Sequence, residues 1–489
     1  MNRKYDVIII GAGVVGCMIA RFLSRYRLEV LLIEKECDVG MGASGANTAI
    51  IHAGYDPEPG TLKAEMNVSG NPMWDSLAAE LGFPFERKGD YVLAVGSDEL
   101  PKLEDLRRRG IDNGVTGMSL LSGEEMRRRE PRISSDVSGA LWASTGGVCD
   151  PFAVVVAAAE NAIANGVTVL TETGFEDFVL ERGRVVGLVT NRGIFSCDWA
   201  INAAGMYSDE VMQKAGLDGF HVTPRRGEYY VLDHNRITID SILFPVPSAA
   251  GKGILVTTTT HGNVMIGPNS HVIEDKEDRS VTADGLDEVF RGAAKLVPGL
   301  SLNDVIAVFA GLRPTGSTGD FIIEAPGQVE GFINLAGIES PGFVSSPAIA
   351  ARVIELLCDA GCRLEEKSSW NPIRVPRPRF RDLSREAQAQ LIEADPRYGR
   401  IICRCEMVTE GEIVAEIHAP IPARTYDAIK RRTWLGTGRC QGGFDTPRVA
   451  EILSRELGIS HLQVTKKGAG SEILCRPTKD LDTPGRNEW

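Results

Sequence analysis

The chain has 489 residues, more than one ordinary hydrophobic core organises, so two or three domains are expected. Hydrophobic residues make up 43% of it and charged residues 24%, the composition of a soluble globular protein. The formal net charge of −13 argues against binding to nucleic acid or to an anionic membrane surface. No apolar run reaches the roughly 20 residues of a spanning helix, and the N-terminus does not resemble a signal peptide. We therefore expect a cytoplasmic protein.

The chain opens with a predicted β-α-β unit. Residues 5–10 have the pattern of a buried strand, residues 14–26 that of a helix, and residues 29–33 that of a second strand. A Gly-x-Gly-x-x-Gly sequence that begins at Gly11 joins the first strand to the helix. Glu34 ends the second strand, 18 residues after the last glycine of that sequence. This order is typical of a dinucleotide-binding Rossmann unit.

The residue types of this fingerprint have physical reasons. Gly11 permits the tight turn, Gly13 lets a pyrophosphate approach the backbone, and Gly16 lets the helix pack closely on the strand. The helix N-terminus stabilises the charge of the pyrophosphate, and Glu34 can accept hydrogen bonds from the adenosine ribose. The alternative is a glycine-rich corner without a ligand.

After this unit the pattern is that of an α/β scaffold with an insertion. Alternating strands at 228–232, 253–258 and 263–266 predict an antiparallel sheet inserted into the scaffold. A strand at 331–335 and a helix at 345–357 return the chain to it. Further expected elements are helices at 62–81, 151–165 and 285–296 and a strand at 91–95.

A second glycine turn bears on the choice between FAD and NAD. Residues 202–205, Asn-Ala-Ala-Gly, close a strand far downstream of the fingerprint, where they can approach the same dinucleotide. An NAD-binding Rossmann domain usually completes its sheet nearer the fingerprint. A scaffold that is split by an antiparallel insertion therefore favours FAD.

We thus expect an α/β fold: a Rossmann-like FAD-binding domain of the glutathione reductase type, an inserted antiparallel-sheet substrate domain and a small, mostly helical C-terminal domain. Residues 364–400 mix prolines with charges and are predicted to be a linker with little core. The expected bounds are 1–85, 145–220 and 300–363 for the FAD-binding domain, 86–144 and 221–299 for the substrate domain, and 401–478 for the C-terminal module.

Several segments resemble a known family. The fingerprint, Glu34, residues 202–205 and the Gly-Ile-Glu-Ser-Pro-Gly segment at 337–342 resemble the D-amino acid oxidase and glycerol-3-phosphate dehydrogenase superfamily, over about residues 5–360. The segments at 50–54, 59–64 and 226–229 resemble L-2-hydroxyglutarate dehydrogenases. The whole chain is most similar to bacterial proteins named as the large subunit of anaerobic glycerol-3-phosphate dehydrogenase.

The resemblance implies a set of FAD contacts. The segment 337–342 precedes a helix whose N-terminus could stabilise negative charge on a reduced flavin. Asp320 is a weaker candidate, for the ribityl or pyrophosphate region. The implied contacts are Gly11, Gly13, Val14, Gly16, Glu34, Lys35, Ser44, Asn47, Ala204, Gly205, Asp320, Gly337, Ile338, Ser340, Pro341 and Gly342.

His52 is the predicted catalytic base. In this superfamily its loop passes beside the flavin ring, and an imidazole with an unperturbed pKa near 6.5 could accept the substrate hydroxyl proton as hydride leaves the adjacent carbon. The alternative is that His52 only hydrogen-bonds the flavin or the backbone.

An anionic substrate requires positively charged donors, which Arg supplies in bidentate geometry. The family places an arginine of the Gly311 to Pro314 segment at the pocket, so Arg313 is the first candidate anchor, before Arg226 and Lys63. Each of the three could instead be a surface residue. Tyr229 or Tyr230 can line the pocket, but not both, because side chains alternate along a strand.

Three of the ten cysteines have the spacing of metal ligands. Cys403 and Cys405 are separated by one residue, and Cys440 follows 35 positions after Cys405. Residues 401–478 resemble the bacterioferritin-associated ferredoxin-like domain, which holds a [2Fe–2S] cluster on four cysteines. Asp445 stands where the fourth cysteine would be. Three interpretations stay open: Asp445 ligates iron, the site holds zinc, or the cluster is lost and the fold kept.

These features predict an FAD-dependent dehydrogenase that oxidises a small anionic secondary alcohol and passes electrons through the cluster to a partner subunit, itself a flavin or iron–sulfur protein. On the resemblance, glycerol-3-phosphate is the first candidate substrate, with dihydroxyacetone phosphate as product. L-2-hydroxyglutarate or another 2-hydroxy acid is second, and an amino or imino acid is third. An accessory FAD subunit for electron transfer, without a substrate of its own, is a separate possibility.

Overall fold

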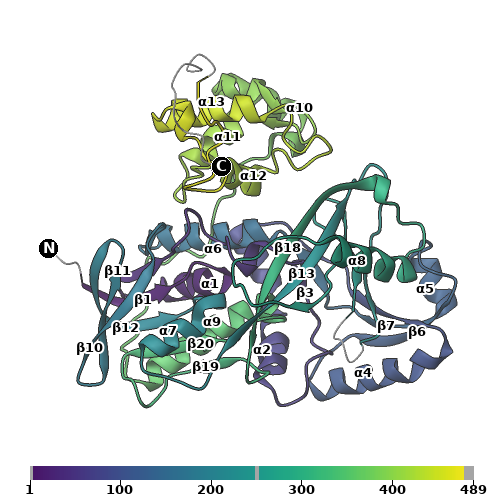
Figure 1. Cartoon of the computed structure of the whole chain (residues 1–489), viewed down its shortest axis with the longest axis horizontal. Helices are drawn as coiled ribbons and strands as arrows, with labels where there is room; N and C mark the ends of the chain where they lie inside the picture. Colours follow the sequence, from purple (N-terminus) through teal and green to yellow (C-terminus); the bar gives the residue numbers. More distant parts are fainter. Residues whose placement is uncertain (1–3, 248–252, 478–489) are drawn as a thin grey trace. The chain divides into compact units, whose positions relative to one another are not determined.

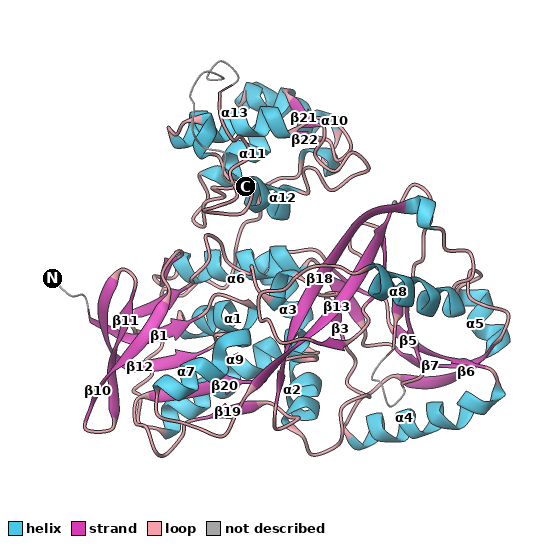
Figure 2. Ribbon diagram, viewed as in Figure 1, coloured by secondary structure: helices cyan, strands magenta, loops and turns pink. Residues whose placement is uncertain are grey.

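The computed structural model describes residues 4–247 and 253–477 and divides the chain into two compact units. The first unit is Met1–Pro376 and the second is Arg377–Trp489. Two large sheets organise the first unit, and the second unit is mostly helical (Figures 1 and 2). Within the described ranges, no helix is both long enough and apolar enough to cross a membrane.

The scaffold sheet of the first unit has eight strands in the described part of the chain. At its centre β1 (Lys4–Ile10) pairs in parallel with β2 (Val30–Ile33) on one side and with β12 (Gly193–Asn202) on the other. The end of β12 also pairs in parallel with β20 (Phe332–Ala336). Strands β2 and β20 are buried at every position, as expected for parallel strands covered by helices. The other strands are β9 (Thr168–Leu170), β10 (Phe175–Glu181), β11 (Arg184–Thr190) and β19 (Ile322–Glu324).

Helices cover this sheet (Figure 2). Helix α1 (Val14–Leu23) contacts both α6 (Pro151–Ala164) and α9 (Gly342–Asp359). Helix α6 starts at Pro151, as predicted, and the Asp150 carboxylate caps it by accepting two backbone N–H bonds. Helix α7 (Ser208–Lys214) follows the second glycine turn.

The second sheet is the predicted insertion, and it has nine strands among the described residues. Strands β13 (Val222–Leu232) and β18 (Val305–Gly316) form a long antiparallel pair, while β5 (Asp90–Val95) and β14 (Ile242–Pro245) pair in parallel. The other strands are β6 (Met118–Ser122), β7 (Val137–Ala143), β15 (Leu255–Thr258), β16 (Val264–Gly267) and β17 (His271–Val272). A small third sheet joins β3 (Ile50–Ile51), β4 (Phe85–Arg87) and β8 (Gly147–Cys149).

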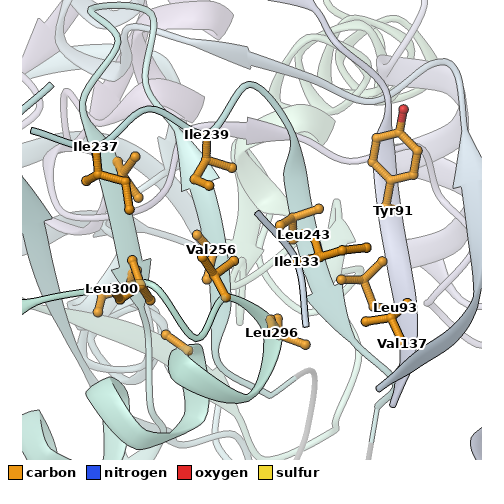
Figure 3. Close-up of a cluster of buried hydrophobic side chains, with 14 of the residues drawn as sticks. Tyr91, Leu93, Ile133, Val137, Ile237, Ile239, Leu243, Val256, Leu296 and Leu300 are labelled. Atoms are coloured by element: carbon orange, nitrogen blue, oxygen red, sulfur yellow. The ribbon is translucent and has the colours of Figure 1, made fainter. Parts of the chain in front are cut away.

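The insertion has its own hydrophobic core (Figure 3). Leu93, Leu243 and Val256 come from the neighbouring strands β5, β14 and β15, and Leu296 comes from α8 (Ala283–Leu296). All four side chains are fully or almost fully buried. Two more helices of this region, α4 (Leu100–Asp112) and α5 (Gly123–Arg129), contact β7.

Two expected boundaries in the first unit are wrong. The helix predicted over 62–81 is two helices, α2 (Leu62–Gly70) and α3 (Met73–Leu81), because Pro72 between them cannot donate a backbone hydrogen bond. The domain change expected at residue 300 falls after residue 316 instead, since β18 pairs with β13 of the inserted sheet over its whole length.

The second unit is mostly helical, as predicted. It contains α10 (Arg385–Ala394), α11 (Glu410–Ile417), α12 (Tyr426–Thr433) and α13 (Thr446–Leu457), with a short pair of strands, β21 (Ile401–Cys403) and β22 (Val408–Thr409). Its core includes Ile413, Ile429, Leu435 and Val449, all fully buried.

The segment 364–400 differs from the expected linker with little core. Arg374 donates from Nε to the buried carboxylate of Glu160 at 2.6 Å, within the first unit. Arg377 donates to the buried Glu416 at 2.6 Å, within the second. The charges that suggested a solvated linker are therefore paired with buried carboxylates, and the unit boundary lies inside the segment.

Candidate functional site

The fingerprint turn is packed so tightly that only glycine fits at two positions. Gly11 has a φ of +102°, and a Cβ there would lie 2.6 Å from the carbonyl oxygen of Ala203 in the second glycine turn. A Cβ at Gly16 would overlap the carbonyl oxygen of Gly11. At the start of α1, Ser44 Oγ accepts a hydrogen bond from the Val14 N–H at 2.9 Å. The two glycine turns therefore meet, as the sequence predicts.

Glu34 follows the end of β2 and keeps acceptor capacity. Its Oε2 accepts the Ala12 N–H at 2.8 Å and its Oε1 accepts the Glu36 N–H at 3.0 Å. Burial raises the pKa of the Glu34 carboxyl, and these two N–H groups oppose the rise. Each oxygen retains a second lone pair, which a ribose hydroxyl can use.

A cavity of about 1070 Å³ extends from the fingerprint to the inserted sheet. Its wall includes the turn between β1 and α1, residues from β13 and β18, and residues 338–343. Sites for drug-sized ligands occupy roughly 300–1,000 Å³, so this cavity has the size that a dinucleotide together with a small substrate requires. With Glu34 and the glycine turns in its wall, the cavity fits FAD.

Most of the predicted FAD contacts line this cavity. The lining includes Gly11, Gly13, Val14, Glu34, Lys35, Ser44, Asn47, Ala204, Gly205, Ile338, Ser340, Pro341 and Gly342. Three predicted contacts, Gly16, Asp320 and Gly337, are not part of it. Gly16 instead has the packing role that the fingerprint assigns to it.

Asp320 caps a helix. Its two carboxylate oxygens accept the backbone N–H groups of Leu62 and Lys63, at 2.8 and 3.0 Å, at the start of α2. Lys63 lines the cavity, but its Nζ lies 2.8 Å from the carboxylate of Glu339, so its charge is already compensated. Thr315 also donates to Glu339, at 2.8 Å. The structure thus gives Asp320 a helix-capping position and ties Lys63 to the segment 337–342.

Helix α9 begins at the cavity wall. Its first residues Gly342 and Phe343 line the cavity, and the N-cap residue Pro341 provides no side-chain cap. The backbone N–H groups at the start of a helix carry partial positive charge. This end of α9 is therefore suited to an anionic group in the cavity.

His52 lines the cavity beside Phe244, with 5.7 Å between the ring centroids. Its backbone carbonyl accepts two hydrogen bonds, from Asn67 Nδ2 and Asn71 Nδ2, both at 2.9 Å. These bonds fix the main chain from which the imidazole extends into the wall.

Two arginines lie directly opposite each other in this wall. Arg225 on β13 and Arg313 on β18 are register partners in the antiparallel pair, and both line the cavity. Arg313 donates to Ser270 Oγ and to the carbonyl of Asn269, each at 3.1 Å, and these acceptors are neutral. The buried Nε of Arg225 has no hydrogen-bond partner among the described residues. The wall thus carries two arginines on one cross-strand pair.

Arg226 lies elsewhere. It is not part of the cavity lining, and its guanidinium bonds to Asp278 at 2.7 Å and to Ser280 at 3.1 Å. Neighbouring residues on a strand point to opposite faces, which places Arg225 rather than Arg226 in the cavity. By the same alternation Tyr229 lines the cavity and Tyr230 belongs to the core of the insertion, so the prediction that only one of them faces the pocket is confirmed.

Arg225 lines the cavity but is not among the site residues predicted from the sequence. The available signal was the parity of the strand, since Arg225 and Tyr229 are four residues apart and share a face. The segment that carries the resemblance, residues 226–229, begins one position after Arg225.

In the second unit, the four predicted metal ligands form two pairs. Cys405 Sγ lies 3.6 Å from Cys440 Sγ. Burial raises the pKa of the Cys403 thiol to about 11, and the nearby Asp445 carboxyl adds to the rise. Over the ranges that the structure describes, no three His, Cys, Asp or Glu side chains are grouped so that they could hold a metal ion.

A dinucleotide-binding scaffold that carries an inserted sheet, with a cationic pocket in its cavity wall, is the architecture of a flavin-dependent oxidoreductase. Residues 6–356 match the family described as FAD dependent oxidoreductase, and the chain belongs to that family. Residues 401–455 match the BFD-like [2Fe-2S] binding domain. The predicted FAD-binding domain and [2Fe–2S]-type module are thereby confirmed.

Individual relatives agree with this assignment. A glycerol 3-phosphate dehydrogenase of Caloramator mitchellensis is 46% identical over 97% of this chain and 99% of its own length. The FAD-bound structure of L-alpha-glycerophosphate oxidase from Mycoplasma pneumoniae is 32% identical, covers 77% of this chain and 100% of its own, and superposes with a TM-score of 0.73. The mitochondrial L-2-hydroxyglutarate dehydrogenase of Arabidopsis thaliana is 28% identical over 72% of this chain and 83% of its own.

Proposed function

We propose that this chain is an FAD-dependent dehydrogenase that oxidises glycerol-3-phosphate to dihydroxyacetone phosphate. The observation that supports it most is the cross-strand pair of Arg225 and Arg313 in the cavity wall. A phosphate dianion has the charge and the oxygens to engage two guanidinium groups at one point, whereas a carboxylate has a single charge and two oxygens. The name of the 46% identical relative points to the same substrate.

In the proposed reaction, the alcohol carbon loses a hydride and its hydroxyl loses a proton, which leaves a ketone. FAD, when bound, supplies the acceptor for the hydride. His52 takes the hydroxyl proton, and its doubly hydrogen-bonded main chain holds the imidazole in the wall for that purpose. Arg225 and Arg313 hold the phosphate, so that the carbon and the hydroxyl are presented in one orientation.

L-2-hydroxyglutarate is the second candidate substrate, because a relative of that name is similar over 72% of this chain. It carries its two charges on separate carboxylates at opposite ends of the molecule. Arg225 and Arg313 are both on one cross-strand pair, and this arrangement suits two carboxylates at opposite ends of a molecule less well than it suits a single phosphate.

We further propose that the electrons leave singly through the second unit to a partner protein that contains a flavin or an iron–sulfur centre. The support is the match of residues 401–455 to a [2Fe-2S] binding domain, since such a centre carries one electron and a flavin takes two. All ten cysteines lie in the described part of the chain and none forms a disulfide bond there, which suits a reducing compartment such as the cytoplasm.

Phosphate recognition can be tested with alanine variants of three arginines, two that line the cavity and one that does not. Replacing Arg225 or Arg313 by Ala removes charge-assisted hydrogen bonds worth about 1.5–3 kcal/mol, so KM for glycerol-3-phosphate should rise roughly 10- to 100-fold. Arg226→Ala is the matched control, because Arg226 bonds to Asp278 outside the cavity lining. Steady-state kinetics with an artificial electron acceptor give the three KM values. An unchanged KM in R225A and R313A would remove the phosphate site from the proposal.

A further inference from the structure

Asp445 is buried in the second unit, beside Cys403, and does not cap the helix that it precedes. It occupies the N-cap position of α13, where an aspartate usually accepts backbone N–H bonds, yet its side chain makes no capping bond. The residue is 1% exposed, and its Oδ2 is buried with no hydrogen-bond partner among the described residues. Burying an unpaired carboxylate oxygen is costly, and a bound ion is a common reason for such a group in a native protein.

The surroundings of Asp445 place it beside Cys403. Its Oδ1 accepts the hydroxyl of Tyr426 at 2.7 Å. Gly436 packs closely against the same hydroxyl group, because a Cβ added to this glycine would lie only 2.5 Å from the hydroxyl oxygen. The N–H of Gly436 in turn donates to Cys403 Sγ at 3.5 Å, and Cys403 is also 1% exposed. Asp445 and Cys403 are thus held next to each other by one tyrosine and one glycine.

The other two candidate ligands form a separate pair, Cys405 and Cys440, with 3.6 Å between their sulfur atoms. Gly438 lies against this pair, since a Cβ there would be 2.5 Å from the Cβ of Cys405. The loop that contains Gly436 and Gly438 therefore contacts both pairs.

We propose that Asp445 is the fourth protein ligand of the [2Fe–2S] cluster, with Asp445 and Cys403 on one iron and Cys405 and Cys440 on the other. A [2Fe–2S] cluster needs two protein ligands for each iron, so two pairs match it. A carboxylate has the same charge as the thiolate that it replaces, and the net charge of the cluster is unchanged. The proposal rests on the family match of residues 401–455 and is independent of the substrate.

A single zinc ion fits these residues less well. Structural zinc is surrounded by four ligands at about 2.0–2.3 Å from one centre. In the described part of the chain, not even three candidate side chains are grouped to hold one ion. The division into two pairs therefore favours a two-iron centre.

Oxygen ligation makes the two irons of the cluster chemically different. A carboxylate is a harder donor than a thiolate, and ligand identity helps to set the potential of an iron–sulfur centre. Replacing Asp445 by Cys should therefore leave a cluster whose reduction potential and EPR g-values differ from those of wild type.

The test compares Asp445→Asn, Asp445→Cys and wild type in the full-length protein, after reconstitution with ferrous iron and sulfide. Iron, sulfide and FAD are counted per chain, and EPR spectra are recorded after one-electron reduction. We expect wild type to hold the cluster, D445N to lose most of the iron at unchanged FAD content, and D445C to regain the iron with shifted g-values. Glu451→Ala removes an exposed carboxylate from α13 and should match wild type.

Two results would overturn the proposal. One is a D445N protein with the iron content and EPR spectrum of wild type, because Asp445 would then not touch the metal. The other is a wild-type protein that takes up no iron, or zinc alone, while D445C assembles a cluster. None of these readouts involves substrate, so failure here leaves the proposed dehydrogenase activity standing.

Discussion

His52 combines a fixed main chain with an imidazole in the cavity wall. Asn67 lies in α2 and Asn71 is the C-cap residue of that helix, and both side chains donate a hydrogen bond to the His52 carbonyl. Such positioning is what a general base requires, since proton transfer depends on a short and well-directed approach to the hydroxyl. The arginine pair in the wall of the same cavity can bind an anion but supplies no base, because arginine stays protonated.

Replacing His52 by Gln should lower the rate of substrate-dependent flavin reduction by about 10²- to 10⁴-fold, because the base is lost while the side chain keeps polar atoms. FAD content should not change. Stopped-flow absorbance under anaerobic conditions measures the rate. His261→Gln is the control, since His261 lies 3.4 Å from Asp150 and is not part of the cavity lining. Reduction of H52Q at the wild-type rate would rule out the base role.

At this scale, residue type and spacing predicted the close packing of the fingerprint turn, but only one of the two arginines that line the cavity as a cross-strand pair. Gly11 and Gly16 could be assigned because their close contacts are a property of the strand–turn–helix unit itself. Arg225 and Arg226 could not be told apart from type alone. Which of them faces the cavity is decided by the register of β13 against β18, a contact between distant parts of the chain.

At the scale of elements, α2 is connected to segments that lie far from it in the sequence. The Asp320 carboxylate follows β18 in the chain and accepts two N–H bonds at the N-terminus of α2, while Thr61 caps the same helix through Ala64. Lys63 on this helix also reaches Glu339. The position of α2, which bears Asn67, is thereby linked to the segment 337–342.

Asp320→Ala should destabilise the first unit by about 0.5–2 kcal/mol, the usual effect of removing a helix cap. Asp320→Asn keeps one carbonyl acceptor and should lose less. Thermal release of flavin, followed by its fluorescence, reports on this unit separately from the second. Equal melting temperatures for D320A and wild type would show that the cap contributes nothing.

Element positions were predicted better than element boundaries and partners. Periodicity identified α6 and α8 and the alternating strands of the insertion. It did not separate α2 from α3 at Pro72, nor assign β18 to the inserted sheet, because strand pairing is not visible in a single segment. The segment 364–400 was predicted to be a linker with little core for a similar reason. Its arginines Arg374 and Arg377 pair with carboxylates outside the segment, and such pairs are not visible in the segment itself.

At the scale of the whole molecule, the chain joins two kinds of redox site. The first unit contains the dinucleotide cavity with its arginine pair, and the second contains the four candidate cluster ligands. A two-electron flavin reaction and a one-electron centre in the same chain suit a dehydrogenase that delivers electrons to another protein. Length and composition alone indicated more than one domain, whereas only the sequence motifs could predict which cofactor each domain binds.

The most direct measurement is the visible spectrum of the anaerobic protein during titration with glycerol-3-phosphate, glycerol and L-2-hydroxyglutarate in parallel. We predict that glycerol-3-phosphate bleaches the oxidised flavin band, and that glycerol at the same concentration does not, because it lacks the phosphate that Arg225 and Arg313 bind. L-2-hydroxyglutarate should reduce the flavin more slowly or not at all. Flavin that L-2-hydroxyglutarate bleaches while glycerol-3-phosphate leaves it oxidised would contradict the proposed substrate.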